Sequence, residues 1–501
     1  MILLPQAAFS APDVRWAALV PVLIVLGTAV LSVLVEAFAP VRARRPIVIG
    51  LALFATGAAA AVLALRWTTV LAAPASLGEY IEDPLTVGAQ FVLAIIGFLS
   101  VLVMADRTRV GDGSFAAQPS DRPGSAAEEL SEAKGYQRSE VFPLALFSLG
   151  GMMVFPAADN FVALFVALEV MSLPLYVLAA TARRRRQLSH EAALKYFVLG
   201  AFSSAFMLMG AALLFGASNS LTISALAQAI GASVAMDRLV LIGVLCVMIG
   251  LLFKVGAAPF HAWAPDVYTG APTPVTGFMA AAVKVAAFGA ALRFYQVVAG
   301  LLSWDLLPVF LAVAAATIVV GAGFILIGVF SLVKGSSGHV LLYVLSYGLA
   351  TVGAFGVVTL VRTRDQDGAV GGEANQLSRW AGLGRTNPWV AASMLVFLLS
   401  FAGIPLTGGF IGKFVVFSDG AAGGLAWLVA VALVASAVTA FYYFRLVRLM
   451  FFTEPEGDAV VVRSEGLTGI AVAVCAVATI ALGVFPGPVL SQLSKIVILL
   501  P

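Results

Sequence analysis

Apolar stretches long enough to cross a membrane recur along this chain from Trp16 to Leu499, with only short polar breaks between them. A membrane-spanning helix needs roughly 20 mostly apolar residues. Hydrophobic residues make up 61% of the sequence and charged residues 11%, whereas a soluble domain has about 45–50% and about 25%. The sequence therefore predicts an all-α integral membrane protein.

Thirteen spans are predicted, at residues 16–38, 47–67, 85–104, 141–158, 160–181, 191–216, 238–263, 271–299, 308–330, 338–361, 388–417, 424–452 and 466–496. The first is too long for the apolar core of a cleavable signal, so it is expected to be a retained helix. The segment Asp106–Glu140 is rich in Ser, Gly, Asp, Glu and Arg, which predicts a solvated, mobile loop.

Arginines near the span ends indicate the orientation, because cytoplasmic loops are enriched in Lys and Arg. The loops after the first and fifth spans, with Arg42–Arg45 and Arg183–Arg186, are both predicted to be cytoplasmic, with the N-terminus outside. The loops Arg362–Arg385 and Arg445–Arg463 should be cytoplasmic too, but they follow the tenth and twelfth spans. The predicted spans are therefore one crossing short, and span 308–330 is long enough for one crossing but not for two.

Composition argues against a cofactor or a nucleic acid as a partner of this chain. Its two cysteines, Cys246 and Cys475, lie inside apolar spans with no spacing for a disulfide, zinc or iron–sulfur site. The glycines are scattered through apolar segments and form no phosphate-binding loop. The net charge of +3 is concentrated at span ends and argues for topology rather than for nucleic acid. We expect no cofactor and no metal site here.

Four ionisable residues lie inside apolar spans: Glu169, Lys254, Lys284 and Lys413. A charge near the bilayer centre costs several kcal/mol, so such residues commonly mark ion paths. A static ion pair between helices is the alternative. Three lysines share one deep glutamate, however, so at least two of them must be neutral or hydrated. Lys413 lies nearer the end of its span, and its side chain could instead reach the membrane surface.

Two of the spans contain helix breaks. Pro259 lies a little over one turn after Lys254, and Pro405 lies among glycines before Lys413. Proline removes a backbone donor and kinks or interrupts a helix. Paired interrupted helices in the two halves of a transporter indicate an ion site, although an ordinary proline kink is the alternative for each one alone.

Two further residues are weaker candidates for proton relays. Lys195 lies one turn into its span, where it could instead form a surface pair with Glu191, four residues earlier. His261 lies beside the break after Lys254, and a histidine pKa near neutrality suits a relay, but a hydrogen-bonded structural histidine is the favoured alternative.

The segments Leu164–Tyr176, Leu194–Gly200, Lys254–Val275 and Gly403–Lys413 together resemble the antiporter-like subunits of the proton-pumping NADH:quinone oxidoreductase (respiratory complex I), and the subunit N family in particular. The resemblance implies that Glu169 pairs with Lys254, that Lys284 is the central relay, and that Lys413 faces the exit. It also implies that NADH, FMN, iron–sulfur clusters and quinone are bound by other subunits, and that the partners are other membrane subunits of the complex, M and K among them, in a bacterial plasma membrane.

The resemblance further implies an antiporter-like bundle of about 13–14 transmembrane helices, with two interrupted helices and two inverted five-helix repeats. We place N-terminal helices and the polar loop at 1–140, the repeats at 141–299 and 305–452, and a C-terminal helix at 453–501. The motif Lys-Arg-Leu-Leu-Ala-Tyr-Ser-Ser of the family is absent. By this resemblance, about one helix is lacking at the join near Ala322–Gly323, which leaves two explanations open: a deletion in the sequence, or a genuine variant with compensating re-entrant structure.

The sequence is thus most consistent with a proton-translocating membrane subunit whose activity is coupled to quinone reduction elsewhere in the complex. A stand-alone cation/proton antiporter subunit of the Mrp type is the main alternative, because it shares this architecture. A purely structural membrane subunit is the third possibility.

Overall fold

The computed structural model describes residues 15–107, 114–115, 125–134, 139–232, 237–320, 323–364, 370–455, 459–461 and 466–499. The first part of the chain forms α1 (Trp16–Phe38), α2 (Val41–Ala72), β1 (Ala75–Ser76), β2 (Ile81–Glu82), α3 (Pro84–Ala105), α4 (Ala126–Ala133), α5 (Val141–Val154), α6 (Phe161–Ala179), α7 (Arg186–Ser218), α8 (Ile223–Ala232), α9 (Asp237–Val255), α10 (Trp263–Gly270), α11 (Thr273–Phe278) and α12 (Lys284–Val297).

The second part forms α13 (Ser303–Val319), α14 (Phe324–Phe330), α15 (Ser336–Leu360), β3 (Val361–Arg364), β4 (Val370–Glu373), α16 (Leu383–Thr386), α17 (Pro388–Ala402), α18 (Gly408–Ala422), α19 (Ala426–Phe452), β5 (Ala459–Val461), α20 (Leu467–Val484) and α21 (Gly487–Leu493). Short 3-10 helices follow α5 and α12 and precede α16, and a π-helical turn, Met279–Val283, joins α11 to α12. The all-α membrane bundle predicted from the sequence is confirmed: eleven helices of the described residues are long and apolar enough to cross a membrane.

Polar residues cap several of these apolar helices. The Asn160 side chain accepts a hydrogen bond from the backbone N–H of Val162 at the start of α6 (2.7 Å), and Asp83 accepts one from Thr86 at the start of α3 (2.9 Å). The first N–H groups of a helix have no partner within it, so such caps fix where the helix begins.

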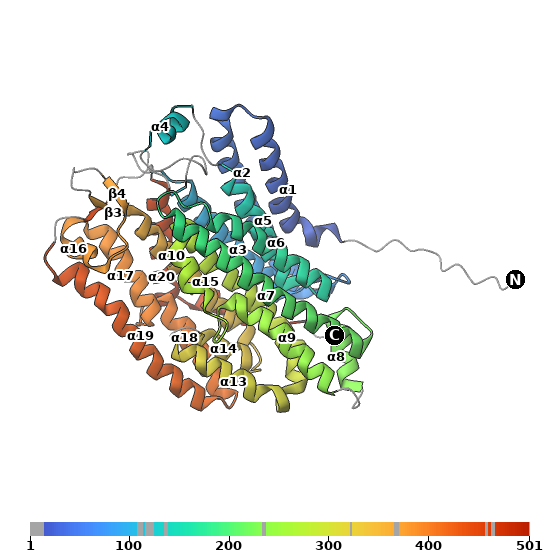
Figure 1. The fold of residues 1–501 in the computed structure, drawn as a ribbon. Helices are drawn as coiled ribbons and strands as arrows, with labels where there is room; N and C mark the ends of the chain where they lie inside the picture. Colours follow the sequence, from blue (N-terminus) through green and yellow to red (C-terminus); the bar gives the residue numbers. More distant parts are fainter. Residues whose placement is uncertain are drawn as a thin grey trace.

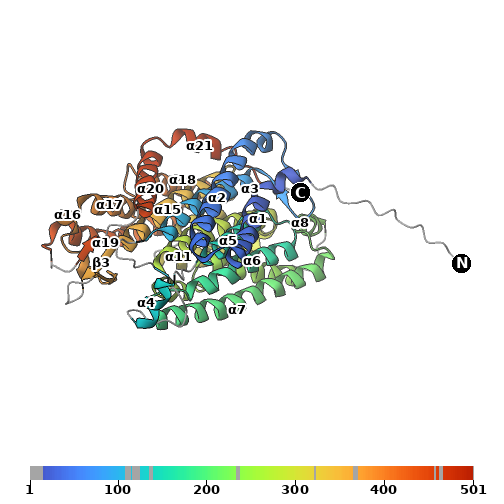
Figure 2. The same ribbon diagram turned by 90° about the horizontal axis from the view of Figure 1, so that it is seen from above.

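The centre of the bundle is formed by α3, α15 and the continuous segment from α11 to α12. These three are buried along most of their length, whereas α7 and α19 expose one face to the surroundings. Figure 2, viewed from above, shows α7 along one outer face and α15 further inside. The segment that carries Lys284 is therefore almost completely buried, while the Lys284 side chain itself is half-buried.

The arginine-rich loops gather at one end of the bundle. The Arg45 guanidinium donates to the Ala105 carbonyl at the end of α3, and Asp106, next to it, accepts from the backbone N–H of Thr468 at the start of α20 (2.9 Å). Near α20, β5 pairs with β3, and Glu373 of β4 pairs with Arg185 (2.6 Å). Figure 1 shows β3, β4 and α16 together at the upper left. We call this the arginine end.

The polar segment expected between Asp106 and Glu140 lies mostly outside the described residues. Its described part contains α4, whose Glu128 pairs with Arg183 at the arginine end (2.7 Å). The expectation of a mobile loop is therefore untested for most of this segment.

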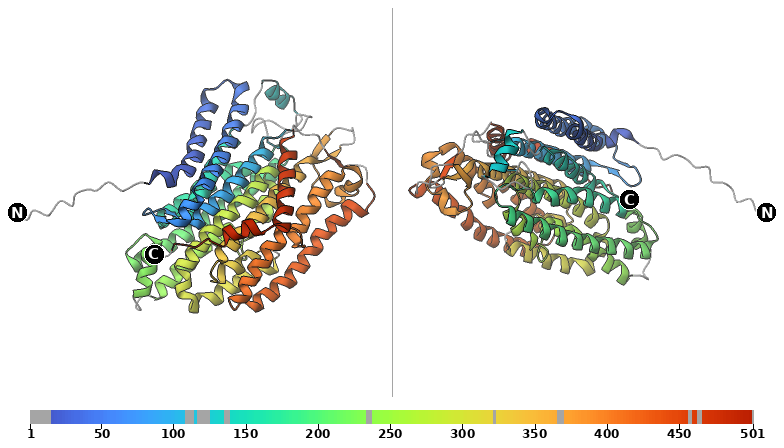
Figure 3. Two further views of the ribbon diagram at one scale, coloured as in Figure 1. Left: turned by 180° about the vertical axis from the view of Figure 1, so that it is seen from behind. Right: turned by 45° about the horizontal axis from the view of Figure 1, so that its top comes forward.

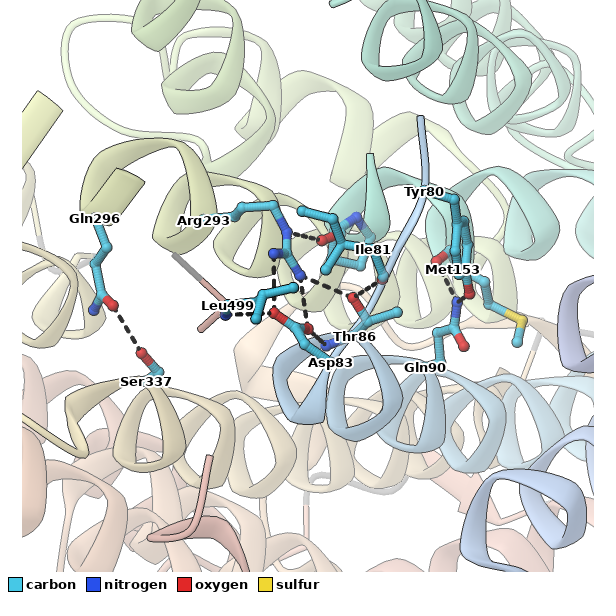
Figure 4. A network of polar contacts seen from close by, with 11 residues as sticks. Tyr80, Ile81, Asp83, Thr86, Gln90, Met153, Arg293, Gln296, Ser337 and Leu499 are labelled. Atoms are coloured by element: carbon cyan, nitrogen blue, oxygen red, sulfur yellow. Dashed lines mark hydrogen bonds and ion pairs between the residues drawn. The ribbon is translucent and has the colours of Figure 1, made fainter. Parts of the chain in front are cut away.

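The opposite end of the bundle is joined by a buried ion pair. Arg293 of α12 donates to Asp83 at 2.8 and 3.0 Å, to Thr86 at 2.9 Å and to the Pro156 carbonyl at 2.7 Å, and Asp83 also accepts from the backbone N–H of Leu499 (3.1 Å). Figure 4 shows these contacts, and Figure 3 (left) shows α21 lying across the bundle from behind. One ion pair thus links α3, α12 and the C-terminal segment.

The prediction of one continuous span over 308–330 is wrong, because α13 and α14 form a re-entrant hairpin. The Phe330 ring at the end of α14 lies 5.4 Å from Phe310 in the middle of α13 and 4.9 Å from Tyr295 of α12 (ring centroids), and Leu332, after α14, lies beside Gly300, before α13. Gly323 precedes α14 with a φ of +90°, a conformation that favours glycine, and a Cβ there would lie 2.5 Å from Thr317. The hairpin thus enters and leaves at the same end of the bundle.

This hairpin explains the arginine count. Its two arms, α13 and α14, run in opposite directions and add no net crossing between α12 and α15, so α15 runs back towards the arginine end and delivers Arg362 there. The four arginine-rich loops then lie on one side, as the sequence required. The apparent missing crossing came from counting the hairpin as a complete span.

Candidate functional site

The first interrupted helix places Lys254 inside an aromatic cage. α9 ends at Val255 and α10 begins at Trp263, so Lys254 is in the last turn before the break around Pro259. Its ammonium lies 5.1 Å from the Tyr196 ring centroid and 5.5 Å from that of Tyr176. Aromatic faces attract cations, but the lysine side chain is only 1% exposed and has no hydrogen-bond partner among the described residues.

The direct pairing of Glu169 with Lys254, implied by the resemblance, is not formed in this structure. Glu169 lies on α6, and Tyr176 lies two turns further along the same helix, against the lysine. No ion pair joins the carboxylate to Lys254, although both residues are described. The neighbours of the ammonium in this structure are instead the rings of Tyr176, Tyr196 and Phe253.

The re-entrant hairpin supports the break after Lys254. The backbone N–H of Ala258, in the unwound segment, donates to the Thr317 hydroxyl of α13 (3.0 Å), and that hydroxyl donates to the Val313 carbonyl (2.6 Å). An unwound segment within a membrane must find such partners outside its own helix. His261 lies in the same unwound segment, and its Nδ1 is buried without a partner among the described residues.

Replacing Thr317 with valine is expected to lower the free energy of unfolding by about 1–3 kcal/mol, because the Ala258 N–H would stay buried without an acceptor. The thermal midpoint of the purified full-length chain, followed by tryptophan fluorescence, measures the loss. Thr56→Val is the matched control: Thr56 is also buried, but its hydroxyl donates only to carbonyls of its own helix, Ala52 and Leu53. Equal losses in both variants would contradict the proposed support of the break.

Lys284 lies where a π-helical turn meets α12. The turn Met279–Val283 ends directly before it, and such turns are frequent at functional sites. The Lys284 ammonium donates to the Tyr347 hydroxyl of α15 (3.1 Å) and lies 4.7 Å from the centroid of that ring. The lysine thus meets a hydroxyl rather than a carboxylate.

The second interrupted helix encloses Lys413. α17 ends at Ala402 and α18 begins at Gly408, on either side of Pro405, as predicted. The Lys413 ammonium donates to the freed carbonyls of Phe401 (2.9 Å) and Ala402 (3.1 Å) and to the Ser436 hydroxyl (2.8 Å). The possibility that Lys413 reaches the membrane surface is excluded here, since it is 6% exposed and faces the break.

A cavity of about 110 Å³ joins these parts of the molecule. Lys284, Tyr347 and the hairpin tip border it, and its two ends reach Gly256 at the first break and Ser400 and Phe401 at the second. The Phe324 ring of the hairpin also lies 4.8 Å from the Lys413 ammonium. The hairpin therefore contacts both breaks and closes one side of the space between them.

Lys195 is not part of this arrangement. Its ammonium lies 2.6 Å from Glu191, which confirms the predicted i,i+4 pair, and 2.6 Å from Asp266 of α10. All three side chains are 41–54% exposed on the outer face of α7 and α10. This group is a surface network at the arginine end.

The tyrosines were missed by reasoning from the sequence. Tyr176, Tyr196 and Tyr347 lie against the buried lysines, but a tyrosine in an apolar span carries no charge that would single it out. Their position in the chain was the available signal, because Tyr176 ends the segment Leu164–Tyr176 and Tyr196 lies within the segment Leu194–Gly200, both of which carry the family resemblance.

Comparison with known proteins agrees with this geometry. A family model described as NADH:quinone oxidoreductase/Mrp antiporter, TM, matches residues 158–326 and 321–439, two segments that meet at the hairpin tip. A protein of Beutenbergia cavernae named NADH-quinone oxidoreductase subunit N is 50% identical, with 97% of this chain and 98% of that protein covered. A protein of the same name from Mycobacterium tuberculosis is 45% identical, with 96% and 97% covered.

Solved structures that resemble this chain include chains of respiratory complex I and of an Mrp complex. A chain of respiratory complex I from Thermus thermophilus with bound Aureothin has a TM-score of 0.76 and 30% identity, with 95% of this chain and 100% of that chain covered. A chain of the Mrp complex from Dietzia sp. has a TM-score of 0.78 at 19% identity, with 96% and 97% covered, and it shows the fold alone.

Two interrupted helices with buried lysines, within this bundle, define an antiporter-like membrane subunit. Within this class, the relatives that are 44–50% identical over nearly the whole chain are proteins named NADH-quinone oxidoreductase subunit N. The chain belongs to the NADH-quinone oxidoreductase subunit N family.

Proposed function

We propose that this chain translocates protons along Glu169, Lys254, Lys284 and Lys413 as a membrane subunit of an NADH:quinone oxidoreductase. The observation that carries the proposal is the cavity that extends from the first helix break, past Lys284, to the second. Ionisable residues buried in a membrane bundle mark ion paths, and interrupted helices supply free carbonyls and room for water along such a path.

The Glu169–Lys254 pair is the proposed switch. A neighbouring carboxylate stabilises the charged form of a lysine, and burial without a partner destabilises it. Lys254 without a partner, as here, corresponds to the state that gives up its proton. A conformational or electrostatic change from the quinone-reducing part of the complex would bring Glu169 closer or move it away, so that protons are driven towards Lys284 and Lys413. His261, beside the first break, is a secondary relay candidate.

The same proposal includes the orientation of the chain in the membrane, its repeats and its neighbouring subunits. The arginine end faces the cytoplasm of a bacterial plasma membrane, and the Trp16 end of α1 lies outside. Residues 141–299 and 305–452 form two inverted repeats, with the hairpin in place of two helices of the second. NADH, FMN, iron–sulfur clusters and quinone are bound by other subunits, and this chain contacts the neighbouring membrane subunits, M and K among them.

Replacing Lys254 with methionine tests this function. The variant keeps the length of the side chain but cannot hold a proton, so the assembled complex in vesicles should translocate fewer protons per electron from NADH to quinone, by the share that this subunit carries. Lys495→Met is the control, because Lys495 is exposed and, among the described residues, its ammonium hydrogen-bonds to Gln492, three residues earlier on the surface. An unchanged ratio of protons to electrons in Lys254→Met would refute the role proposed for this lysine.

Purification of the chain with its partners separates the remaining alternatives. Flavin and iron–sulfur subunits isolated with it are expected for a complex I subunit. Sodium-dependent proton exchange in their absence would instead support the Mrp type, and the sequence identities above favour the first outcome.

A further inference from the structure

The path between Lys284 and Lys413 contains no second charged side chain among the described residues that border the cavity. Lys284 is at one side, and Lys413 lies behind Phe401, whose carbonyl it contacts at 2.9 Å. A proton that moves from one lysine to the other must therefore cross a space in which hydroxyl groups are the only ionisable or exchangeable side-chain groups available.

Two of the five hydroxyls that border the cavity in the described part of the chain already form hydrogen bonds with backbone groups. Thr317 accepts from Ala258 and donates to Val313, and the Ser400 hydroxyl accepts from the Gly409 N–H (3.1 Å). Tyr343 and Tyr443 border the cavity, but neither forms a hydrogen bond to a lysine among the described residues. Among the described hydroxyls that border the cavity, that of Tyr347 is the one hydrogen-bonded to a lysine ammonium.

We propose that the Tyr347 hydroxyl relays the proton from Lys284 into the cavity that leads to Lys413. The Lys284 ammonium donates to the hydroxyl oxygen, which leaves the hydroxyl's own proton free to point into the cavity. A cavity of about 110 Å³ has room for several water molecules, each of which takes about 30 Å³ in the liquid. The inference rests on the proposed function, because it requires that Lys284 carries a translocated proton.

The transfer balances without forming a tyrosinate. The oxygen of Tyr347 takes one proton from the Lys284 ammonium and gives its own proton to a water in the cavity, so the tyrosine ends neutral and Lys284 ends as an amine. The extra proton on the water passes to Lys413 once that ammonium, which here donates to the Phe401 and Ala402 carbonyls and to Ser436, has released its own proton. The Tyr347 ring lies 5.8 Å from the Phe401 ring, whose backbone carbonyl binds Lys413. The relay residue thus stands between the two lysines.

Tyr347→Phe tests the relay, because it removes only the hydroxyl. We expect the assembled complex with this variant, in vesicles, to lose the same number of protons per electron as Lys284→Met, while the amount of assembled complex and NADH oxidation with an uncoupler stay unchanged. Tyr295→Phe is the matched control: its hydroxyl is also buried and has no partner in the described part of the chain, but it lies in the aromatic cluster of the hairpin, away from the cavity.

Each outcome decides the matter. Loss in Tyr347→Phe with none in Tyr295→Phe supports the relay. A normal ratio in Tyr347→Phe beside a lowered ratio in Lys284→Met overturns the relay and leaves the proposed function standing. Normal ratios of protons to electrons in Tyr347→Phe and in Lys284→Met would refute the proposed function itself. Equal losses in both tyrosine variants, or a loss that follows a fall in assembled complex, would show a packing role and overturn the relay.

Discussion

Arg293→Ala is expected to lower the free energy of unfolding by about 3–5 kcal/mol, the range for removing one partner of a buried ion pair. Arg293 and Asp83 are 2% and 0% exposed. The substitution would leave the Asp83 carboxylate with only the backbone N–H groups of Thr86 and Leu499, and the Pro156 carbonyl without its donor. The thermal midpoint of the purified full-length chain and its yield in the membrane measure the loss.

Two further variants make this prediction specific. Arg293→Lys keeps the charge but cannot donate to Asp83, Thr86 and Pro156 at once, so an intermediate midpoint is expected. Lys195→Ala removes an exposed ion pair, where solvent screens the attraction, and should change the midpoint little. If Arg293→Ala and Lys195→Ala behaved alike, the ion pair would not hold this end of the bundle together.

The sequence predicted those features of the fold that depend on local hydrophobicity. The first predicted span, 16–38, has the bounds of α1, and the breaks around Pro259 and Pro405 lie between separate helices. These features depend on composition and on proline chemistry over a few residues, so they can be recognised without knowing what packs against them.

The re-entrant hairpin could not be predicted in the same way. Residues 308–330 are apolar throughout, because α14 is buried among other helices, and a buried half-helix has the same composition as part of a membrane span. The arginine count nevertheless detected the error, since it depends on the parity of crossings rather than on hydrophobicity.

The candidate site, like the fold, has one part that the sequence predicts and one part that depends on tertiary packing. Buried charge singled out Lys254, Lys284 and Lys413, which line or face the two breaks and the cavity between them. Their partners depend on tertiary packing: Lys413 meets carbonyls and Lys284 meets a tyrosine. Arg293 was not selected, because it lies near the end of its span, where an arginine commonly reaches the surface.

Gly409→Ala is expected to disturb both the stability of the chain and proton translocation, because two half-helices touch at this position. A Cβ on Gly409 would lie 2.0 Å from the Ser400 carbonyl oxygen and 2.7 Å from the carbonyl carbon, both backbone atoms that cannot rotate away. Forced overpacking costs about 1–3 kcal/mol, and occasionally more. A clash with backbone should fall at the upper end of this range.

The functional effect follows from what the two half-helices hold. Moving the start of α18 away from the end of α17 separates Lys413 from the carbonyls of Phe401 and Ala402, which bind its ammonium. We therefore expect fewer protons per electron in whatever complex assembles, together with a lower thermal midpoint. Gly469→Ala is the matched control, since its Cβ would meet nothing within 4 Å on the exposed side of α20, and alanine favours a helix. An active, stable Gly409→Ala variant would mean that the contact between the half-helices is not needed to hold Lys413 at the break.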